Sequence, residues 1–177
     1  MKIASLSAAM LLTLASCTTA PVGENDRQML VQESTDALKQ MRAEDPSLGK
    51  FLDRSDGYAI FPNIGKGGLI AGGAYGRGIL FEKGHMIGYS DLSQATIGLQ
   101  AGGQSYTELV VFEQQRDVDR FVGGRFTFAA NASAVAIKTG AAQSAQYTDG
   151  AAVFVEPVGG LMVEAAIGGQ QFTFTPR

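Results

Sequence analysis

The chain has 177 residues, of which 23 are glycine, one is cysteine and none is tryptophan. The formal net charge is −3, with 14 basic and 17 acidic side chains, and this balance argues against a nucleic-acid partner, because DNA- and RNA-binding surfaces carry excess positive charge. A single cysteine excludes an intramolecular disulfide, and the length favours one domain with one hydrophobic core.

Residues 1–16 are typical of an export signal, with one charge at Lys2 followed by an apolar run, Ile3–Leu14, that is too short to span a bilayer. The sequence Leu-Ala-Ser-Cys that ends at Cys17 resembles the lipobox of bacterial lipoproteins, in which the signal is removed before the cysteine and the cysteine is acylated. We therefore expect residues 1–16 to be a lipoprotein signal peptide. We expect residues 17–26 to consist of Cys17, lipidated with acyl chains such as palmitate, and a polar tether. The alternative is an ordinary secretory signal with a cysteine near its cleavage site.

Removal of the signal would leave 13 basic and 17 acidic side chains, a net charge of −4. By resemblance to the sorting rules of such lipoproteins, Thr18 after the cysteine predicts an outer-membrane protein that faces the periplasm. Acyl chains would hold the protein at the bilayer, because each buried methylene contributes about 0.8 kcal/mol. The folded domain is then expected to comprise residues 27–177.

An amphipathic helix is predicted from Asn25 to Glu44. Its apolar and small side chains fall on one stripe at helical spacing, namely Leu30, Ser34, Ala37, Leu38 and Met41. Acidic residues come early in this segment and basic residues come late, which suits the helix dipole. Pro46 ends the helix, and we expect a turn or a short second helix before Gly57.

After Gly57 the chain changes to short segments rich in branched and aromatic residues, separated by glycine or polar turns. The predicted strands are residues 58–63, 67–76, 77–83, 85–91, 95–106, 107–114, 124–137, 151–157, 160–168 and 171–176. Within 114–124, apolar residues stand at helical spacing and two glycines follow. We therefore predict an α+β fold, in which the N-terminal amphipathic helix packs on an antiparallel sheet that coils strongly or closes into a barrel-like form, with one short inserted helix.

The sequence contains none of three familiar enzyme motifs, because the residues that each motif requires do not occur at the required spacing. Gly65 and Lys66 are followed by Gly67 rather than by Ser or Thr, so they do not form a P-loop, and the glycine-rich region contains no Gly-x-Gly-x-x-Gly dinucleotide fingerprint. The chain also lacks a Gly-x-Ser-x-Gly nucleophile elbow. His85 is the single histidine, and we expect it in a solvated hairpin turn without partners for a metal site. We predict no catalytic residue, no metal site and no cofactor.

The paired carboxylates along the chain are interpreted as surface charges. Glu44 with Asp45 and Asp53 with Asp56 have no apolar pocket implied around them, so we expect them to be solvated. The aspartates at positions 117 and 119 are expected to favour the start of the inserted helix rather than to form a calcium loop.

The segment from Gly65 to Gly84 combines many glycines with the cations Lys66, Arg77 and Lys83. Glycine within a strand lets the backbone approach another backbone or a ligand closely, and Lys and Arg are good partners for phosphate. Two interpretations follow: either the glycines and cations bind an amphiphile, or the glycines relieve crowding in a coiled sheet and the cations are solvated. A similar stretch, residues 159–169, is predicted to pair with residues 67–73.

The stretch IFPNIGKGGLIAGGAYGRGIL, residues 60–80, resembles the signature of the SYLF family of lipid-binding domains, also described as the actin-regulator domain. The resemblance continues through GYSDLSQATIGLQAGGQS, FTFAANASAVA and GGLMVEAAIGG, and it extends from Asp36 to the end of the chain. Tyr89 stands where the family has tryptophan. With its lipobox, the chain is similar to the bacterial lipoprotein branch of this family.

This resemblance implies a non-catalytic domain that binds phospholipid or a phosphoinositide-like ligand at a membrane reached through the lipid anchor. The positions that match the family's basic and glycine residues are Lys66, Gly67, Gly68, Gly76, Arg77 and Gly78. Eukaryotic members bind phosphoinositides and some bind actin filaments, whereas an exported bacterial lipoprotein meets neither, so we expect lipid binding and no actin partner. The alternative is a structural envelope protein that binds another periplasmic protein through an exposed sheet face.

Overall fold

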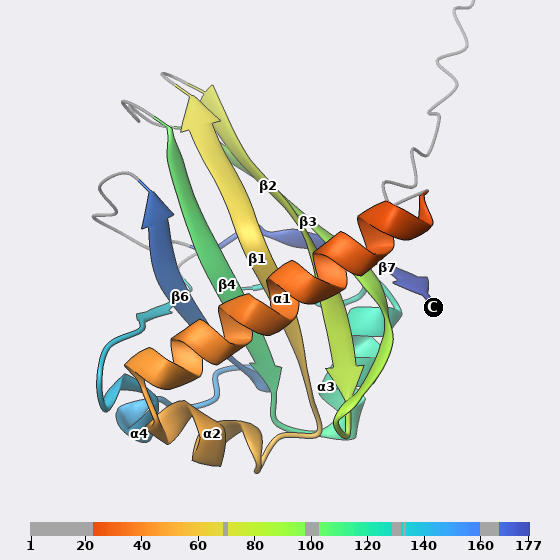
Figure 1. The fold of residues 1–177 in the computed structure, drawn as a ribbon. Coiled ribbons are helices and arrows are strands. Elements are labelled where there is room, and N and C mark those ends of the chain that lie inside the picture. Colours follow the sequence, from red (N-terminus) through yellow and green to blue (C-terminus); the bar gives the residue numbers. More distant parts are fainter. Residues whose placement is uncertain (1–22, 69–70, 98–102, 129–131, 133, 160–166) are drawn as a thin grey trace, which may run out of the picture.

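The computed structural model describes residues 23–68, 71–97, 103–128, 132, 134–159 and 167–177, so the predicted signal peptide and Cys17 lie outside the described residues. The fold is α+β: a long helix, α1 (Glu24–Glu44), crosses the front of a twisted sheet, and α3 (Gln115–Val122) lies behind it (Figure 1). The short helices α2 (Ser47–Leu52) and α4 (Ala141–Ser144) lie near the C-terminal end of α1. No helix within the described ranges combines the length and the hydropathy that spanning a membrane requires.

The described strands form one mixed sheet of seven strands. They are β1 (Gly57–Gly68), β2 (Ala71–Glu82), β3 (His85–Ile97), β4 (Gln104–Phe112), β5 (Val135–Ala136), β6 (Ala151–Gly159) and β7 (Gln171–Pro176). Their order is β5-β6-β4-β1-β2-β3-β7, and neighbours are antiparallel except β5 and β6, which are parallel. Among the described strands the sheet is open, with β5 and β7 at its edges, so they do not form the predicted barrel-like closure. The sheet is antiparallel as predicted except for the parallel pair of β5 and β6.

Helix α1 begins one residue before the predicted Asn25 and ends at Glu44, as predicted. On its predicted stripe, Leu30, Ser34 and Met41 are buried and the other two residues are half-buried. They pack on what we call the α1-side core, whose buried members are Leu30, Met41, Leu48, Leu52, Ile60, Ile79, Tyr89, Leu109, Val111, Ile137, Ala142, Ala152 and Phe154. Burial of each large side chain stabilises this packing by about 1.5–3 kcal/mol.

The opposite face of the sheet carries a second core, which we call the α3-side core. Its buried members are Ala59, Phe61, Ile64, Ala74, Leu80, Leu92, Tyr106, Val110, Phe112, Val118, Phe121, Phe126, Ala151, Val153, Val155, Ile167 and Phe172. Aromatic rings dominate its centre, where Phe121 lies 4.9 Å from Phe172 and 5.0 Å from Phe112 between ring centroids. Because these rings and α3 occupy this face, the sheet wraps around a filled interior.

A β-bulge at Pro62 bends the central strand β1. The pairing register shifts between Ile60 and Asn63 against β2, and between Phe61 and Ile64 against β4. Proline has no backbone N–H to donate to the ladder, and a bulge is one of the few places in a sheet that tolerates it. The Thr107 hydroxyl donates to the Pro62 carbonyl oxygen over 2.9 Å, which satisfies a backbone group that the bulge displaces from the ladder.

Several strand predictions differ from the structure. β2 runs unbroken through Gly76 and Arg77, where the sequence predicted a break between two strands. Gly76 and Gly78 allow close approach of the backbone there and do not form a turn. β3 likewise continues to Ile97. The predicted strand 124–137 is wrong for most of the residues that the structure describes there, since among them only Val135–Ala136 pair. Phe126 and Phe128, which alternate before them, enter the α3-side core from a segment without strand pairing. The predicted strand 160–168 lies largely outside the described residues.

Two of the carboxylates interpreted as solvated are structural instead. Asp45 is 0% exposed and accepts four hydrogen bonds, from Ser47 N and Oγ, Gly140 N and Ala142 N. Asp56 is half-buried, and its Oδ2 accepts a bond from the first amide of α3 over 2.8 Å. Apart from Ser47, the donors to these carboxylates lie 59 or more residues away along the chain, so local sequence could not reveal those contacts. The neighbouring carboxylates at 44 and 53 are exposed, as predicted.

Candidate functional site

Lys66 and Arg77 lie on opposite faces of the sheet. Lys66 stands opposite Ala74, a member of the α3-side core, whereas Arg77 stands opposite Asn63 and lines a groove beside α1. Since directly paired residues of neighbouring strands share a face and successive residues alternate, the two cations point in opposite directions. The structure therefore does not bring together the two cations that the sequence placed in one site.

The predicted glycines divide into crowded and open positions. A Cβ atom on Gly78 would overlap the Ile60 carbonyl oxygen and lie 2.6 Å from the Phe61 ring, and one on Gly76 would lie 2.6 Å from Ile64 Cγ1. A Cβ on Gly67, in contrast, would meet nothing within 4 Å. Gly76 and Gly78 thus relieve crowding beneath the bulge, which is the second interpretation of these glycines. Gly68, the fourth of the predicted glycines, pairs with Gly72 near the end of the β1–β2 hairpin.

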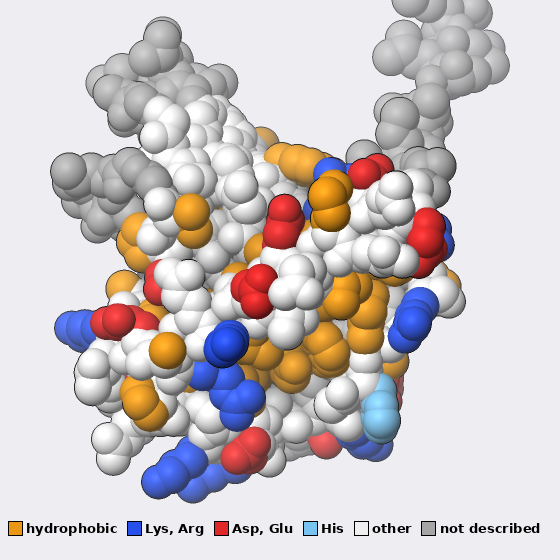
Figure 2. Space-filling view, in the orientation of Figure 1, with side chains coloured by type: hydrophobic (Ala, Val, Ile, Leu, Met, Phe, Trp, Pro, Cys, Tyr) orange, Lys and Arg blue, Asp and Glu red, His pale blue; other side chains and the backbone are white. Residues whose placement is uncertain are grey.

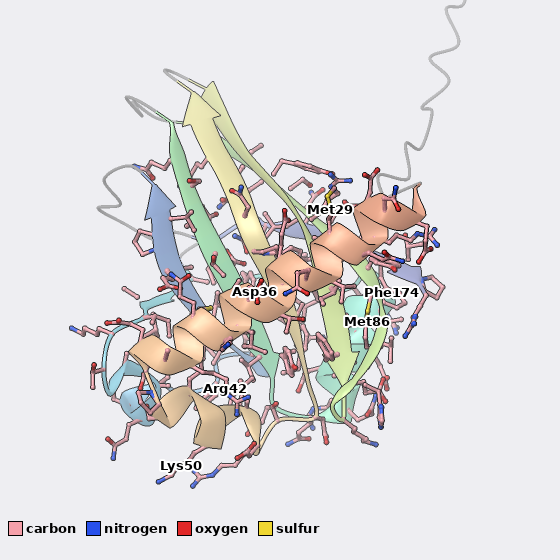
Figure 3. The ribbon with its side chains drawn as sticks, viewed as in Figure 1. Met29, Asp36, Arg42, Lys50, Met86 and Phe174 are labelled. Atoms are coloured by element: carbon pink, nitrogen blue, oxygen red, sulfur yellow. The ribbon has the colours of Figure 1, made fainter. Side chains whose placement is uncertain are left out.

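A groove of about 350 Å³ lies between the N-terminal half of α1 and strands β1 and β2. Its lining residues are Asp26, Met29, Leu30, Glu33, Pro62, Asn63, Tyr75, Gly76 and Arg77. Met29 is 57% exposed and Tyr75 is 45% exposed, and Met29 projects from the upper side of α1 (Figure 3). On this side of α1, hydrophobic, basic and acidic side chains lie next to one another (Figure 2). The groove therefore has the mixed apolar and charged character that suits an amphiphile.

The charges of this groove are arranged on its two sides. Arg77 extends from β2, whereas Asp26 and Glu33 belong to α1. The Tyr75 hydroxyl donates to Asp91 Oδ1 over 3.1 Å, which fixes the ring beside the groove. A guanidinium favours phosphate oxygens, and carboxylates favour ammonium groups. The arrangement can thus accept a ligand that carries both charges.

The sequence interpretation did not single out a carboxyl group in the sheet interior. Glu108 is 0% exposed, and burial raises its pKa to about 8, although a hydrogen bond from Gln170 Nε2, 2.9 Å long, works in the opposite direction. Burial likewise raises the pKa of Tyr106, and the nearby Glu108 raises it further. The sequence did contain a signal for this burial. Glu108 lies at a spacing of two residues from Tyr106 and Val110, so the three side chains share one face of an apolar strand.

Beside the α3-side core, a cavity of about 230 Å³ opens along β6. Apolar side chains including Phe128, Ala132, Val153 and Ile167 form much of its lining, and Gln146 lies among its polar lining residues. Ile167, which lines the cavity, comes three residues before Gln170 in the chain.

His85 begins β3 directly after the turn at Lys83 and Gly84, and it is exposed, as predicted. Lys83 itself adopts a φ of 50°, which accompanies the tight turn. Within the described ranges, no three His, Cys, Asp or Glu side chains come close enough to form a metal site.

Residues 93–174 match the family model Ysc84, described as Las17-binding protein actin regulator. The match begins within β3, so it is narrower than the predicted span from Asp36 and does not include the glycine-rich β1–β2 hairpin. Over 137 residues the chain is 28% identical to beta cell expansion factor A of Aeromonas veronii. The aligned region covers 77% of this chain and 52% of that protein. The chain thus spans about half the length of this curated relative. The C-terminal part of the chain, from β3 through β7, is therefore similar to the Ysc84, or SYLF, family.

Proposed function

We propose that this protein is a non-catalytic phospholipid-binding lipoprotein of the bacterial cell envelope, and that the groove between α1 and β2 binds the lipid headgroup. One observation carries the proposal: the groove places the Arg77 guanidinium beside the exposed apolar side chains of Met29 and Tyr75. The guanidinium would bind phosphate through charge-assisted hydrogen bonds, and the apolar side chains would contact the upper part of the acyl region. The resemblance to lipid-binding domains supports the same ligand class.

The carboxylates of Asp26 and Glu33 favour a zwitterionic headgroup over a purely anionic one. In such a headgroup the phosphate would face Arg77 and the ammonium would face α1. A purely anionic headgroup would gain the first contact but would meet repulsion from the carboxylates. We therefore expect phosphoethanolamine or phosphocholine lipids to bind at least as well as phosphatidylglycerol.

Vesicle flotation of protein that lacks residues 1–17 tests the groove without the anchor. Arg77→Gln is expected to weaken recovery with phosphatidylethanolamine and phosphatidylcholine vesicles about tenfold, because a hydrogen bond to a charged group contributes about 1.5–3 kcal/mol. Lys138→Gln, at an exposed cation outside the groove, is the matched control and should bind like the parent protein. Lys66→Gln, on the other face of the sheet, should also bind normally.

Equal recovery of Arg77→Gln and the parent protein would reject the groove as the headgroup site. If the parent protein does not float with any of the vesicles, the domain has no lipid affinity of its own. That result would favour the alternative function, in which this chain is a structural envelope protein that binds another periplasmic protein.

A lipid anchor on Cys17 is a separate part of the proposal, supported by the lipobox sequence. Cells grown with labelled palmitate should yield labelled protein that sediments with outer membranes. Cys17→Ser should abolish the label and release the protein from the membrane fraction, since no other cysteine is present to carry acyl chains. Persistent label in the variant, or an unlabelled parent protein, would rule out this anchor.

A further inference from the structure

The buried pair Glu108 and Gln170 leaves two oxygen atoms without partners. Gln170 Nε2 donates to Glu108 Oε2 over 2.9 Å, and both side chains are 0% exposed. Glu108 Oε1 and Gln170 Oε1 are also buried, and neither has a hydrogen-bond partner among the described residues. Two unpaired acceptors in one hydrogen-bonded pair are costly, because each buried acceptor without a donor loses about 1–3 kcal/mol. A single added donor between these oxygens would satisfy both.

We propose that Glu108 is a neutral acid in the folded protein and that the proton on its Oε1 is donated to Gln170 Oε1. The carboxylic acid and the amide then form a closed pair with two hydrogen bonds in place of one. The pair acts as a proton-dependent latch, because it fastens the turn before β7 to the interior strand β4. When the proton is lost, an unpaired charge remains in the interior and the second bond cannot form.

Among the described residues, no cation forms an ion pair with Glu108 that would favour its charged form. Its directly paired neighbours are Phe61 on β1 and Val155 on β6, both members of the α3-side core. The titratable groups on this face of the neighbouring strands are Tyr106 and Lys66. Tyr106 lies on the same strand and its hydroxyl also interacts with the Gln170 side chain, whereas Lys66 lies on β1 opposite Gln104. Burial therefore decides the state of this carboxyl and raises its pKa to about 8.

The latch holds a turn that a second interior side chain also contacts. Gln94 Nε2 donates to the Gly168 carbonyl oxygen over 2.9 Å, and Ile167 N donates to the Ala132 carbonyl oxygen over 3.2 Å. Ile167 also lines the cavity along β6. Loss of the proton from Glu108 thus loosens the turn that places Ile167 in the wall of this cavity.

The stability of the protein should fall as the pH rises through the range in which only the folded state retains this proton. An ordinary glutamic acid has a pKa of 4.5, whereas that of Glu108 is about 8 in the fold. Between these values the ratio of unfolded to folded protein should rise about tenfold per pH unit from this group. Below the lower value both states are protonated and the stabilisation is complete, and above the upper value no further loss occurs.

Carbon-13 NMR of the carboxyl groups tests the proposal directly on the full domain. One glutamate carboxyl signal should titrate near pH 8, and it should be missing from the spectrum of Glu108→Gln. In Glu108→Gln the new amide can form both hydrogen bonds with the Gln170 amide at any pH. The denaturant midpoint of this variant should therefore exceed that of the parent protein by an amount that grows from pH 4.5 to about 8 and then remains constant. Glu156→Gln changes a half-buried glutamate that bonds to Gln40 on the α1 side, and its midpoint should follow the parent protein at every pH.

Amide hydrogen exchange reports the latch itself. Above pH 8, the amides of residues 167–171 should exchange several-fold faster in the parent protein than in Glu108→Gln at the same pH, a comparison in which intrinsic base catalysis cancels. A parent protein whose glutamate carboxyls all titrate below pH 6 would overturn the proposal, and this result requires no variant. Parallel pH profiles of Glu108→Gln and the parent protein would overturn it as well.

Discussion

Gly78→Ala is expected to lower the free energy of unfolding by about 3 kcal/mol or more, at the upper end of the cost of overpacking. The added methyl group would overlap the Ile60 carbonyl oxygen and lie 2.6–2.9 Å from the Phe61 ring. Neither group can move easily, because Ile60 belongs to the central strand β1 and Phe61 is fully buried in the α3-side core. Urea denaturation followed by far-UV circular dichroism measures the change.

Gly67→Ala is the matched control in the same hairpin. Its new methyl group would meet nothing within 4 Å, so the free energy of unfolding should stay constant or rise by about 0.5 kcal/mol through the lower entropy of the unfolded chain. The pair separates the two roles considered for the glycines. If Gly67→Ala keeps its stability but loses vesicle binding, Gly67 serves ligand approach; if Gly78→Ala is as stable as the parent protein, crowding does not explain Gly78.

Asp45→Ala is expected to cost about 3–5 kcal/mol of stability. The carboxylate of Asp45 connects the end of α1 to the start of α4 through the amides of Gly140 (3.1 Å) and Ala142 (2.7 Å) and to α2 through Ser47. Its removal leaves the buried amide of Ala142 and the partly buried amides of Gly140 and Ser47 without an acceptor, and a buried donor without an acceptor costs about 1–3 kcal/mol. Chemical denaturation at pH 7 provides the measurement, and Asp53→Ala, at an exposed neighbour, should cost less than about 0.5 kcal/mol.

The same carboxylate should make the protein sensitive to acid. Burial alone would raise the pKa of Asp45, but hydrogen bonds from Ala142, Ser47 and Gly140 outweigh it and hold the pKa below the ordinary value of 3.8. The stabilisation is therefore complete above pH 3.8 and is lost as the pH falls through the lower pKa of the folded state. Asp45→Asn should lack this acid-dependent part of the stability. An equal loss of stability in Asp45→Asn and the parent protein between pH 4 and pH 2 would contradict this role.

The parts of the fold that the sequence predicted correctly depend on local patterns. Helix α1 follows from a stripe of side chains at helical spacing and from Pro46 just beyond its end. The turn before His85 and helix α3 also follow from neighbouring residues. In contrast, Phe126 and Phe128 alternate like strand residues, but their edge-to-face contact, with ring centroids 5.1 Å apart, belongs to an aromatic cluster and not to a strand. Alternation alone does not reveal whether a backbone partner is available.

The candidate site was predicted in part. Arg77 does line a groove, but the sequence placed Lys66 beside it because both cations flank the same glycines. The face to which each cation points depends on the register of the β1–β2 hairpin, which pairs Arg77 with Asn63 and Lys66 with Ala74. The carboxylates of α1 that share the groove with Arg77 come from a distant part of the chain.

By itself, the amino-acid sequence determined the α+β class, the amphipathic helix, the family resemblance and the absence of familiar enzyme motifs, because each depends on residue types at short spacing. Only the tertiary structure decided that Lys66 and Arg77 face apart, that Asp45 joins three helices and that Glu108 lies in the interior. The physical reason is that burial and hydrogen bonding depend on residues tens of positions away, which become neighbours only when the strands pair and the two cores form.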